Sequence, residues 1–140
     1  MKLINKISFL LFFLVTLTSF TTSTEIYVGE WNGTDKGDAG TFIFSEDGYA
    51  TFIMNGNSMG GKSYTQGGEE ASMKYEVNKK VTPFTIDFII ISKKNKNEMG
   101  RMKGILRIIN DDEMLLSIGF GGVPRPKNFE KDILTLNRVK

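Results

Sequence analysis

The sequence predicts an all-β domain, an eight-stranded antiparallel up-and-down barrel. No segment of ten or more residues keeps the apolar spacing of an amphipathic helix, whereas short β-rich runs bounded by Gly, Asn, Asp or Lys recur from residue 27 onwards. The connections between these runs are alternately short and long, so a meander would gather all the long ones at one end. Closure of the sheet would also remove the exposed edges of an open sheet.

The first 23 residues have the order of a secretion signal. Lys2 and Lys6 precede an apolar run over residues 7–17, and a short polar stretch with small side chains at Thr21 and Ser23 follows. A membrane anchor would need about 18 to 20 apolar residues, and this run is shorter and is interrupted by polar ones. We therefore expect residues 1–23 to be a cleaved signal peptide and residues 24–140 to be one exported domain, periplasmic or secreted, with no membrane span.

The first three expected strands cover residues 27–34, 41–45 and 49–54, and the turn between the last two sets their faces. A two-residue turn at Asp47-Gly48 would mix polar and apolar side chains on both faces of this hairpin. A three-residue loop over residues 46–48, with Gly48 in the left-handed conformation, instead gathers the apolar residues on one face. These residues are Phe42, Phe44, Ala50, Phe52 and Met54.

Charged residues orient the next strands, expected at residues 70–77, 84–92 and 101–109. Side chains alternate across a sheet, so one charged side chain in water fixes the direction of its neighbours. Asp87 facing water directs Phe84, Ile86, Phe88 and Ile90 inward. By the same argument, Lys74 and Lys103 facing water direct Met73, Tyr75, Val77, Met102, Leu106 and Ile108 inward.

The last two strands are expected at residues 114–120 and 133–139, with Leu134, Leu136 and Arg138 sharing a face. The long connections are then residues 35–40, 55–69, 93–100 and 121–132, which a meander places around one open mouth. The opposite end is the closed base. Trp31 and Arg138 would both lie there, with the guanidinium stacked on the indole.

Residues 56–63, GNSMGGKS, fit the phosphate-loop pattern G-x-x-x-x-G-K-[ST]. A working phosphate loop needs a helix directly after it to aim backbone amides at the phosphates, and the following Tyr-Thr-Gln-Gly-Gly breaks a helix. The sequence therefore favours a flexible, glycine-rich rim loop over a nucleotide site.

The composition excludes several other classes of function. Lys2 and Lys6 are two of the 18 basic residues, so the exported part holds 16 basic and 16 acidic side chains and lacks the basic surface that nucleic acids require. The chain contains no Cys and no His, which removes the usual general base, the thiolate nucleophile and the commonest metal ligands. We expect no cofactor, no metal and no enzyme activity, the remaining enzymatic alternative being a carboxylate-based hydrolase.

Several short patterns resemble a known family. Gly29-x-Trp31 in the first strand and Arg138 in the last are similar to the lipocalin arrangement of a buried Trp covered by a basic side chain. Residues 81–139 resemble a family of exported bacterial lipocalin-like proteins, abundant in planctomycetes, with no established activity. The matching patterns are P-x-x-I-D at residues 83–87, G-I at 104–105, Asp112 with Met114 where Leu is usual, R-P-x-x-F at 125–129, and L-x-R at 136–138. The resemblance implies a lipocalin-like barrel.

The mouth of the predicted barrel is the candidate binding site. Strand direction brings several bulky apolar residues there, three of them methionines, whose side chains adapt to irregular partners. We expect a small apolar or amphipathic ligand to contact Phe42, Met54, Tyr64, Met73, Ile90, Met102, Phe120 and Leu134. The alternative is a barrel filled by these side chains, since eight strands leave little more room than that. Such a barrel would act as a cell-envelope interaction module or a protease inhibitor and contact a protein partner through its rim loops.

Overall fold

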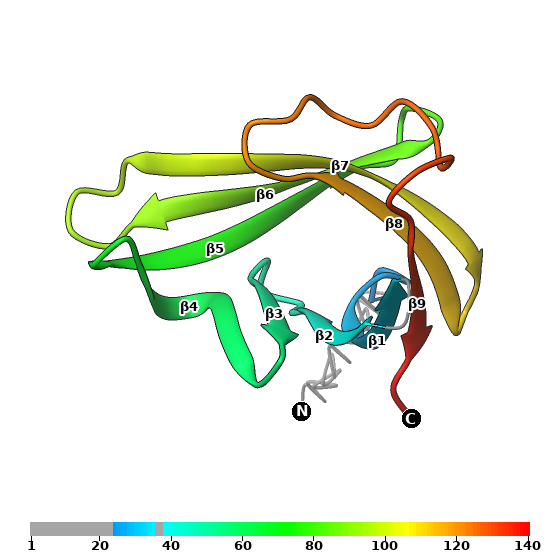
Figure 1. Cartoon of the computed structure of the whole chain (residues 1–140), viewed down its shortest axis with the longest axis horizontal. Helices are drawn as coiled ribbons and strands as arrows, with labels where there is room; N and C mark the ends of the chain where they lie inside the picture. Colours follow the sequence, from blue (N-terminus) through cyan, green and yellow to red (C-terminus); the bar gives the residue numbers. More distant parts are fainter. Residues whose placement is uncertain (1–23, 36–37) are drawn as a thin grey trace, which may run out of the picture.

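The computed structural model describes residues 24–35 and 38–140 and shows a closed antiparallel β-barrel (Figure 1). Each strand is hydrogen-bonded to its neighbours in the chain, and β9 pairs with β1 to close the ring. The strands of the described part are β1 (Gly29–Asp35), β2 (Asp38–Phe44), β3 (Ala50–Met54), β4 (Asn57–Gln66), β5 (Glu69–Asn78), β6 (Phe84–Ser92), β7 (Glu98–Asn110), β8 (Glu113–Gly119) and β9 (Leu134–Arg138). The predicted closed barrel is confirmed, with nine described strands instead of eight.

Within residues 24–35 and 38–140, no helix has the length and apolar character needed to cross a membrane. The expected signal peptide, residues 1–23, lies outside the described residues.

The additional strand is β4, in the segment that the sequence predicted to be a rim loop. Its first four residues pair with β3, and residues 61–66 pair with β5. Between these halves, Gly60 and Gly61 have φ angles of +101° and +78°, which glycine adopts at little cost. A Cβ atom on Gly60 would lie 2.3 Å from the carbonyl oxygen of Ala50, so only glycine fits at this bend.

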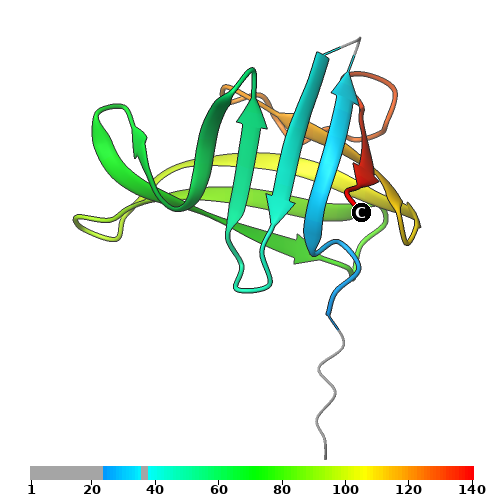
Figure 2. The same ribbon diagram turned by 90° about the horizontal axis from the view of Figure 1, so that it is seen from below.

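The bend in β4 also explains how an odd number of strands closes. A ring of nine straight strands cannot have every neighbouring pair antiparallel, because alternating directions need an even number. Here β3 and β5 are themselves antiparallel, and Tyr49, just before β3, forms a direct antiparallel bridge with Lys74 in the middle of β5. Figure 2 shows β4 leaving the end of β3 and turning away towards the β4–β5 turn. The other strands of the ring therefore alternate in direction as predicted.

Aromatic rings fill the middle of the barrel. The β2–β3 hairpin has the predicted three-residue loop, with Gly48 at φ +89° and Phe42 opposite Phe52. The Phe52 ring lies 5.0 Å from Phe42 and 4.9 Å from Phe88, measured between ring centroids. Burial of each such ring stabilises the fold by roughly 1.5–3 kcal/mol. These rings pack against one another in the core below the mouth.

The base is closed by the predicted contact between Trp31 and Arg138. The guanidinium carbon lies 4.3 Å from the centre of the indole ring, and the two residues are register partners in β1 and β9. The indole Nε1 donates a hydrogen bond to the carbonyl oxygen of Tyr27 at 3.0 Å. The guanidinium donates to the carbonyl oxygens of Ile26, Val28 and Asp111 at 2.6, 2.9 and 2.8 Å. One cation thus joins both ends of the described chain to the β7–β8 turn.

The β8–β9 connection differs from the prediction that it would stand at the rim. It folds back over the outer face of the wall near β7 and β8 (Figure 1). Arg125 forms an ion pair with Asp87 at 2.8 Å and donates to the carbonyl oxygen of Gly104, also at 2.8 Å. The guanidinium carbon of Arg107 lies 4.6 Å from the centre of the Phe129 ring. Residues of three of the family-like patterns therefore meet in one cluster on the outside of the barrel.

Candidate functional site

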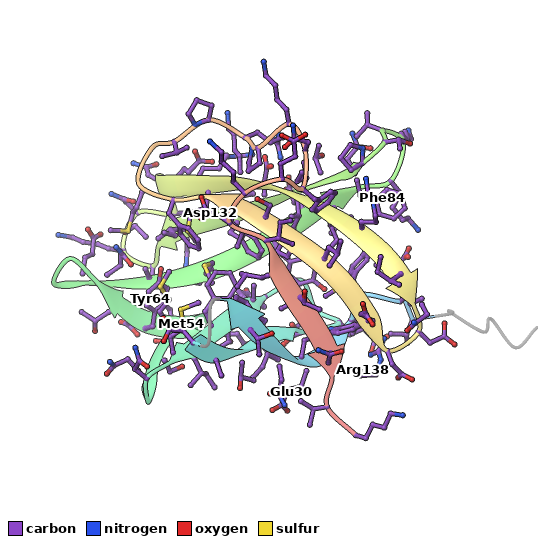
Figure 3. All side chains as sticks on the ribbon, turned by 45° about the vertical axis from the view of Figure 1, so that its right-hand side comes forward. Glu30, Met54, Tyr64, Phe84, Asp132 and Arg138 are labelled. Carbon is purple, nitrogen blue, oxygen red and sulfur yellow. The ribbon has the colours of Figure 1, made fainter. Side chains whose placement is uncertain are left out.

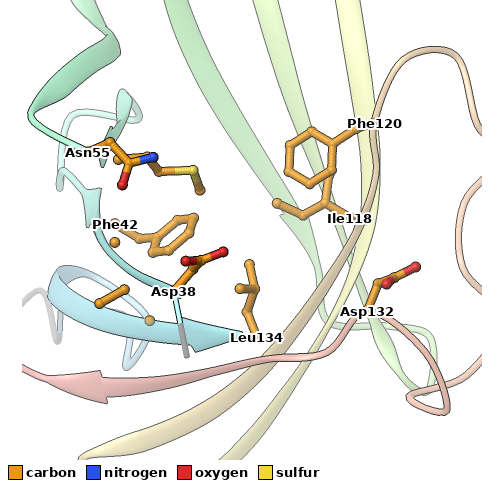
Figure 4. Close-up of a pocket in the computed structure, with 11 residues that line it drawn as sticks. Asp38, Phe42, Asn55, Ile118, Phe120, Asp132 and Leu134 are labelled. Atoms are coloured by element: carbon orange, nitrogen blue, oxygen red, sulfur yellow. The ribbon is translucent and has the colours of Figure 1, made fainter. Parts of the chain in front are cut away.

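An open pocket of about 400 Å³ lies at the mouth, where the ends of β1, β2 and β3 face those of β8 and β9 (Figure 4). This volume lies within the range of small-molecule sites, which is roughly 300–1,000 Å³. The lining residues are Gly33, Asp38, Ala39, Gly40, Phe42, Met54, Asn55, Ile118, Phe120, Asp132 and Leu134.

The apolar wall of this pocket changes from buried to exposed towards the rim. Phe42 is fully buried and Ile118 is 6% exposed, and both belong to the core beneath the pocket. Met54 and Phe120 are 39% and 47% exposed at the rim. Large apolar side chains with this exposure are costly in water, and a ligand that covered them would remove that cost.

Gly33 has no side chain, and this leaves room for its neighbours in the pocket wall. A Cβ atom there would lie 2.6 Å from Cε2 of Phe42 and 2.8 Å from Cδ2 of Leu136. Because no side chain is present, the Phe42 ring packs directly against β1 at Gly33. The ring therefore forms part of the pocket lining and is not pushed into the opening.

Three polar side chains occupy the same pocket. Asp38 begins β2, and Figure 4 shows its carboxylate between Phe42 and Leu134, directed into the opening. Asn55 and Asp132 both have φ of +51°, a conformation that Asn and Asp tolerate better than most residues. In Figure 4 Asp132 lies at the opposite edge, on the β8–β9 connection. The pocket therefore combines an apolar wall with carboxylate and amide groups at its rim.

Half of the predicted contact residues are brought together here. Phe42, Met54, Phe120 and Leu134 line the pocket as expected. Met73, Ile90 and Met102 point inward but are buried in the core, at 0%, 8% and 9% exposure, and do not line it. A Cβ atom on Gly60 would lie 2.6 Å from the Met73 methyl, which shows that the bend of β4 covers this methionine.

Tyr64, the remaining predicted contact, lies on β4 and packs against the core beside the pocket and not in its wall. Its hydroxyl oxygen is buried and has no hydrogen-bond partner among the described residues. Burial raises the pKa of this phenol above its ordinary value. Burial therefore favours the neutral phenol of Tyr64.

The structural residues occupy the other end. In Figure 3 Met54 and Tyr64 lie towards one end of the barrel, and Arg138 lies towards the other. Gly29, Trp31 and Arg138 lie together at the base. Gly29 leaves room for the Arg138 guanidinium, since a Cβ atom there would come within 2.7 Å of it. A molecule bound in the mouth would not contact them.

The phosphate-loop pattern takes part in sheet structure. Residues 57–66 form β4, and a hairpin to β5 follows where a nucleotide-binding loop would require a helix. The Lys62 ammonium pairs with the Asp47 carboxylate at 3.0 Å, and the Ser63 hydroxyl donates to Glu70 at 2.6 Å. The side chains that would hold phosphate and magnesium are thus paired on the outside of the barrel.

The polar part of the pocket was not predicted. Asp38, Asn55 and Asp132 fall in the long connections expected around the mouth, and nothing in their local pattern pairs them with an apolar wall. Ile118 could have been found, because it alternates with Leu116 and Phe120 on the inward face of β8. In the part of the chain that the structure describes, no three acidic side chains are grouped so that they could hold a metal ion.

Comparison of the chain with protein-family models, with curated proteins and with solved structures finds no match.

Proposed function

We propose that the protein is a non-enzymatic, exported, lipocalin-like binding protein that holds a small apolar or amphipathic molecule in the mouth pocket. The observation that carries this proposal is the pocket wall of Phe42, Ile118 and Leu134, with Met54 and Phe120 exposed above it. The packed aromatic residues below the pocket support binding at the mouth, because they occupy the space beneath it.

A neutral fluorescent probe tests the proposal. N-phenyl-1-naphthylamine is uncharged at pH 7 and becomes brighter in an apolar site, and it would be titrated into purified protein comprising residues 24–140. Met54→Glu places a charge in the pocket wall, so we expect it to weaken probe binding at least about fivefold. Met99→Glu is the matched control, because Met99 is also 39% exposed but lies outside the pocket.

Both variants should remain folded, since each replaces an exposed side chain, and thermal unfolding checks this. Absence of probe binding by the folded wild-type protein would contradict the proposal and favour the protein-interaction alternative. Equal weakening by both methionine variants would also contradict it, because the probe would then bind elsewhere.

A further inference from the structure

Charge at the pocket rim suggests which class of amphipathic molecule the mouth prefers. This step rests on the proposed binding function. We infer that the preferred ligand is cationic, an aliphatic or aromatic amine whose apolar body lies against the pocket wall and whose ammonium group lies beside Asp38.

Among the described residues that line the pocket, the charged side chains are those of Asp38 and Asp132, and the ammonium site proposed here needs only Asp38. Asp38 is exposed at the first position of β2 and makes no ion pair with any described residue. Its negative charge therefore faces the opening without a neutralising partner from the described part of the barrel.

The strands that line the pocket, β1, β2, β3, β8 and β9, contain one basic residue, Arg138. Arg138 is held at the base by backbone carbonyls. A ligand carboxylate would therefore meet like charge at Asp38, whereas an ammonium group would meet opposite charge.

The geometry fits both ends of such a molecule. Figure 4 shows the Asp38 carboxylate beside Phe42 and Leu134, so a tail against these residues brings the head group next to the carboxylate. The side-chain amide of Asn55, on the facing turn, supplies an oxygen that accepts a hydrogen bond from an ammonium group. The apolar wall excludes water from one side of this pair, which strengthens the attraction relative to a fully exposed pair.

Three ligands with the same tail separate charge from hydrophobicity. Decylamine, decanol and decanoate would be used below micelle-forming concentrations at pH 7 to displace N-phenyl-1-naphthylamine. We expect decylamine to bind about fivefold more tightly than decanol, with decanoate the weakest, since an exposed ion pair corresponds to roughly a two- to fivefold gain. The preference for the amine should fall as salt is raised from 50 to 500 mM.

Asp38→Asn keeps the shape of the side chain and removes its charge. We expect the preference of decylamine over decanol to fall to within about twofold, while affinity for the neutral probe and for decanol stays unchanged. Asp111→Asn, on the β7–β8 turn at the base, is the matched control, because it changes the net charge equally and should leave the preference intact.

The outcomes distinguish this inference from the proposed function. If the probe binds but decanoate competes as well as decylamine, or Asp38→Asn leaves the preference unchanged, the inference is wrong and the binding function stands. If the folded protein binds neither the probe nor decanol, the binding function fails and the inference fails with it.

Discussion

Replacement of Arg138 measures how much this residue stabilises the closed base. Replacement by Met keeps an apolar stem over Trp31 but removes the cation and three hydrogen bonds to backbone carbonyls. Each bond from a charged donor contributes roughly 1 kcal/mol or more when partly buried, and the stacked cation roughly 1 kcal/mol. The freed carbonyl oxygens of the N-terminal segment and the β7–β8 turn lose their partner at the same time. We therefore expect Arg138→Met to lower the free energy of unfolding by about 3 to 5 kcal/mol.

The assay is urea unfolding followed by fluorescence of Trp31, the single tryptophan of the chain. Arg138→Lys keeps the charge but has a single ammonium group that cannot reach all three carbonyls, so its loss should be intermediate. Lys140→Met is the control, because the Lys140 ion pair with Asp112 is exposed and should contribute less than about 1 kcal/mol. A loss below about 1 kcal/mol for Arg138→Met would refute the assignment of this residue as the clamp of the base.

Two further predictions concern the bend of β4 and the buried phenol in the core. Gly60→Ala should destabilise the protein by about 2 to 5 kcal/mol, because the new methyl group clashes with Ala50 and the residue has a positive φ. Gly68→Ala is the control, because Gly68 also has a positive φ, +79°, but lies in open space, and it should lose about 1 to 2 kcal/mol. Equal losses of the two variants in urea unfolding would show that the clash is unimportant. Burial raises the pKa of Tyr75 to about 12, so the unfolded chain ionises first, and stability present below pH 10 should decline by up to about 2 kcal/mol as the pH rises towards 12. Unfolding measured against pH should show a smaller decline in Tyr75→Phe, and an unchanged decline would contradict the assignment.

The barrel could be predicted wherever apolar alternation and charged residues fixed the faces of strands. β6 has the predicted bounds, and the inward direction of Ile86 and Phe88 follows from Asp87 facing outward. The β2–β3 hairpin was predictable because only one loop length collects all its phenylalanines on one side. In both places local pattern and tertiary burial agree, which is the condition under which sequence reasoning succeeds.

β4 could not be predicted because its residues carry no alternation. Its sequence, NSMGGKSYTQ, contains two adjacent glycines and mostly polar side chains, which are typical of a loop. Its order comes from backbone hydrogen bonds to β3 on one half and to β5 on the other, and such pairing leaves no trace in side-chain pattern.

The pocket was predicted in outline and missed in its polar part. The inward direction of Phe42 and Leu134 followed from strand alternation, but their depth did not. Met73 and Met102 proved to be core residues because β4 and the packed interior cover them, and neither effect is visible locally. Asp38 and Asp132 line the same pocket only because β1 pairs with β9, which is a long-range contact.

The direct bridge between Tyr49 and Lys74 makes the intervening segment an elaboration of the barrel wall. The amide of Tyr75 also donates to the carbonyl oxygen of Gly48, so β5 is joined directly to the β2–β3 turn. The antiparallel order of β3 and β5 therefore does not depend on how many residues connect them. Such a module offers a place where new recognition surfaces could be grafted beside the opening while the scaffold keeps its topology.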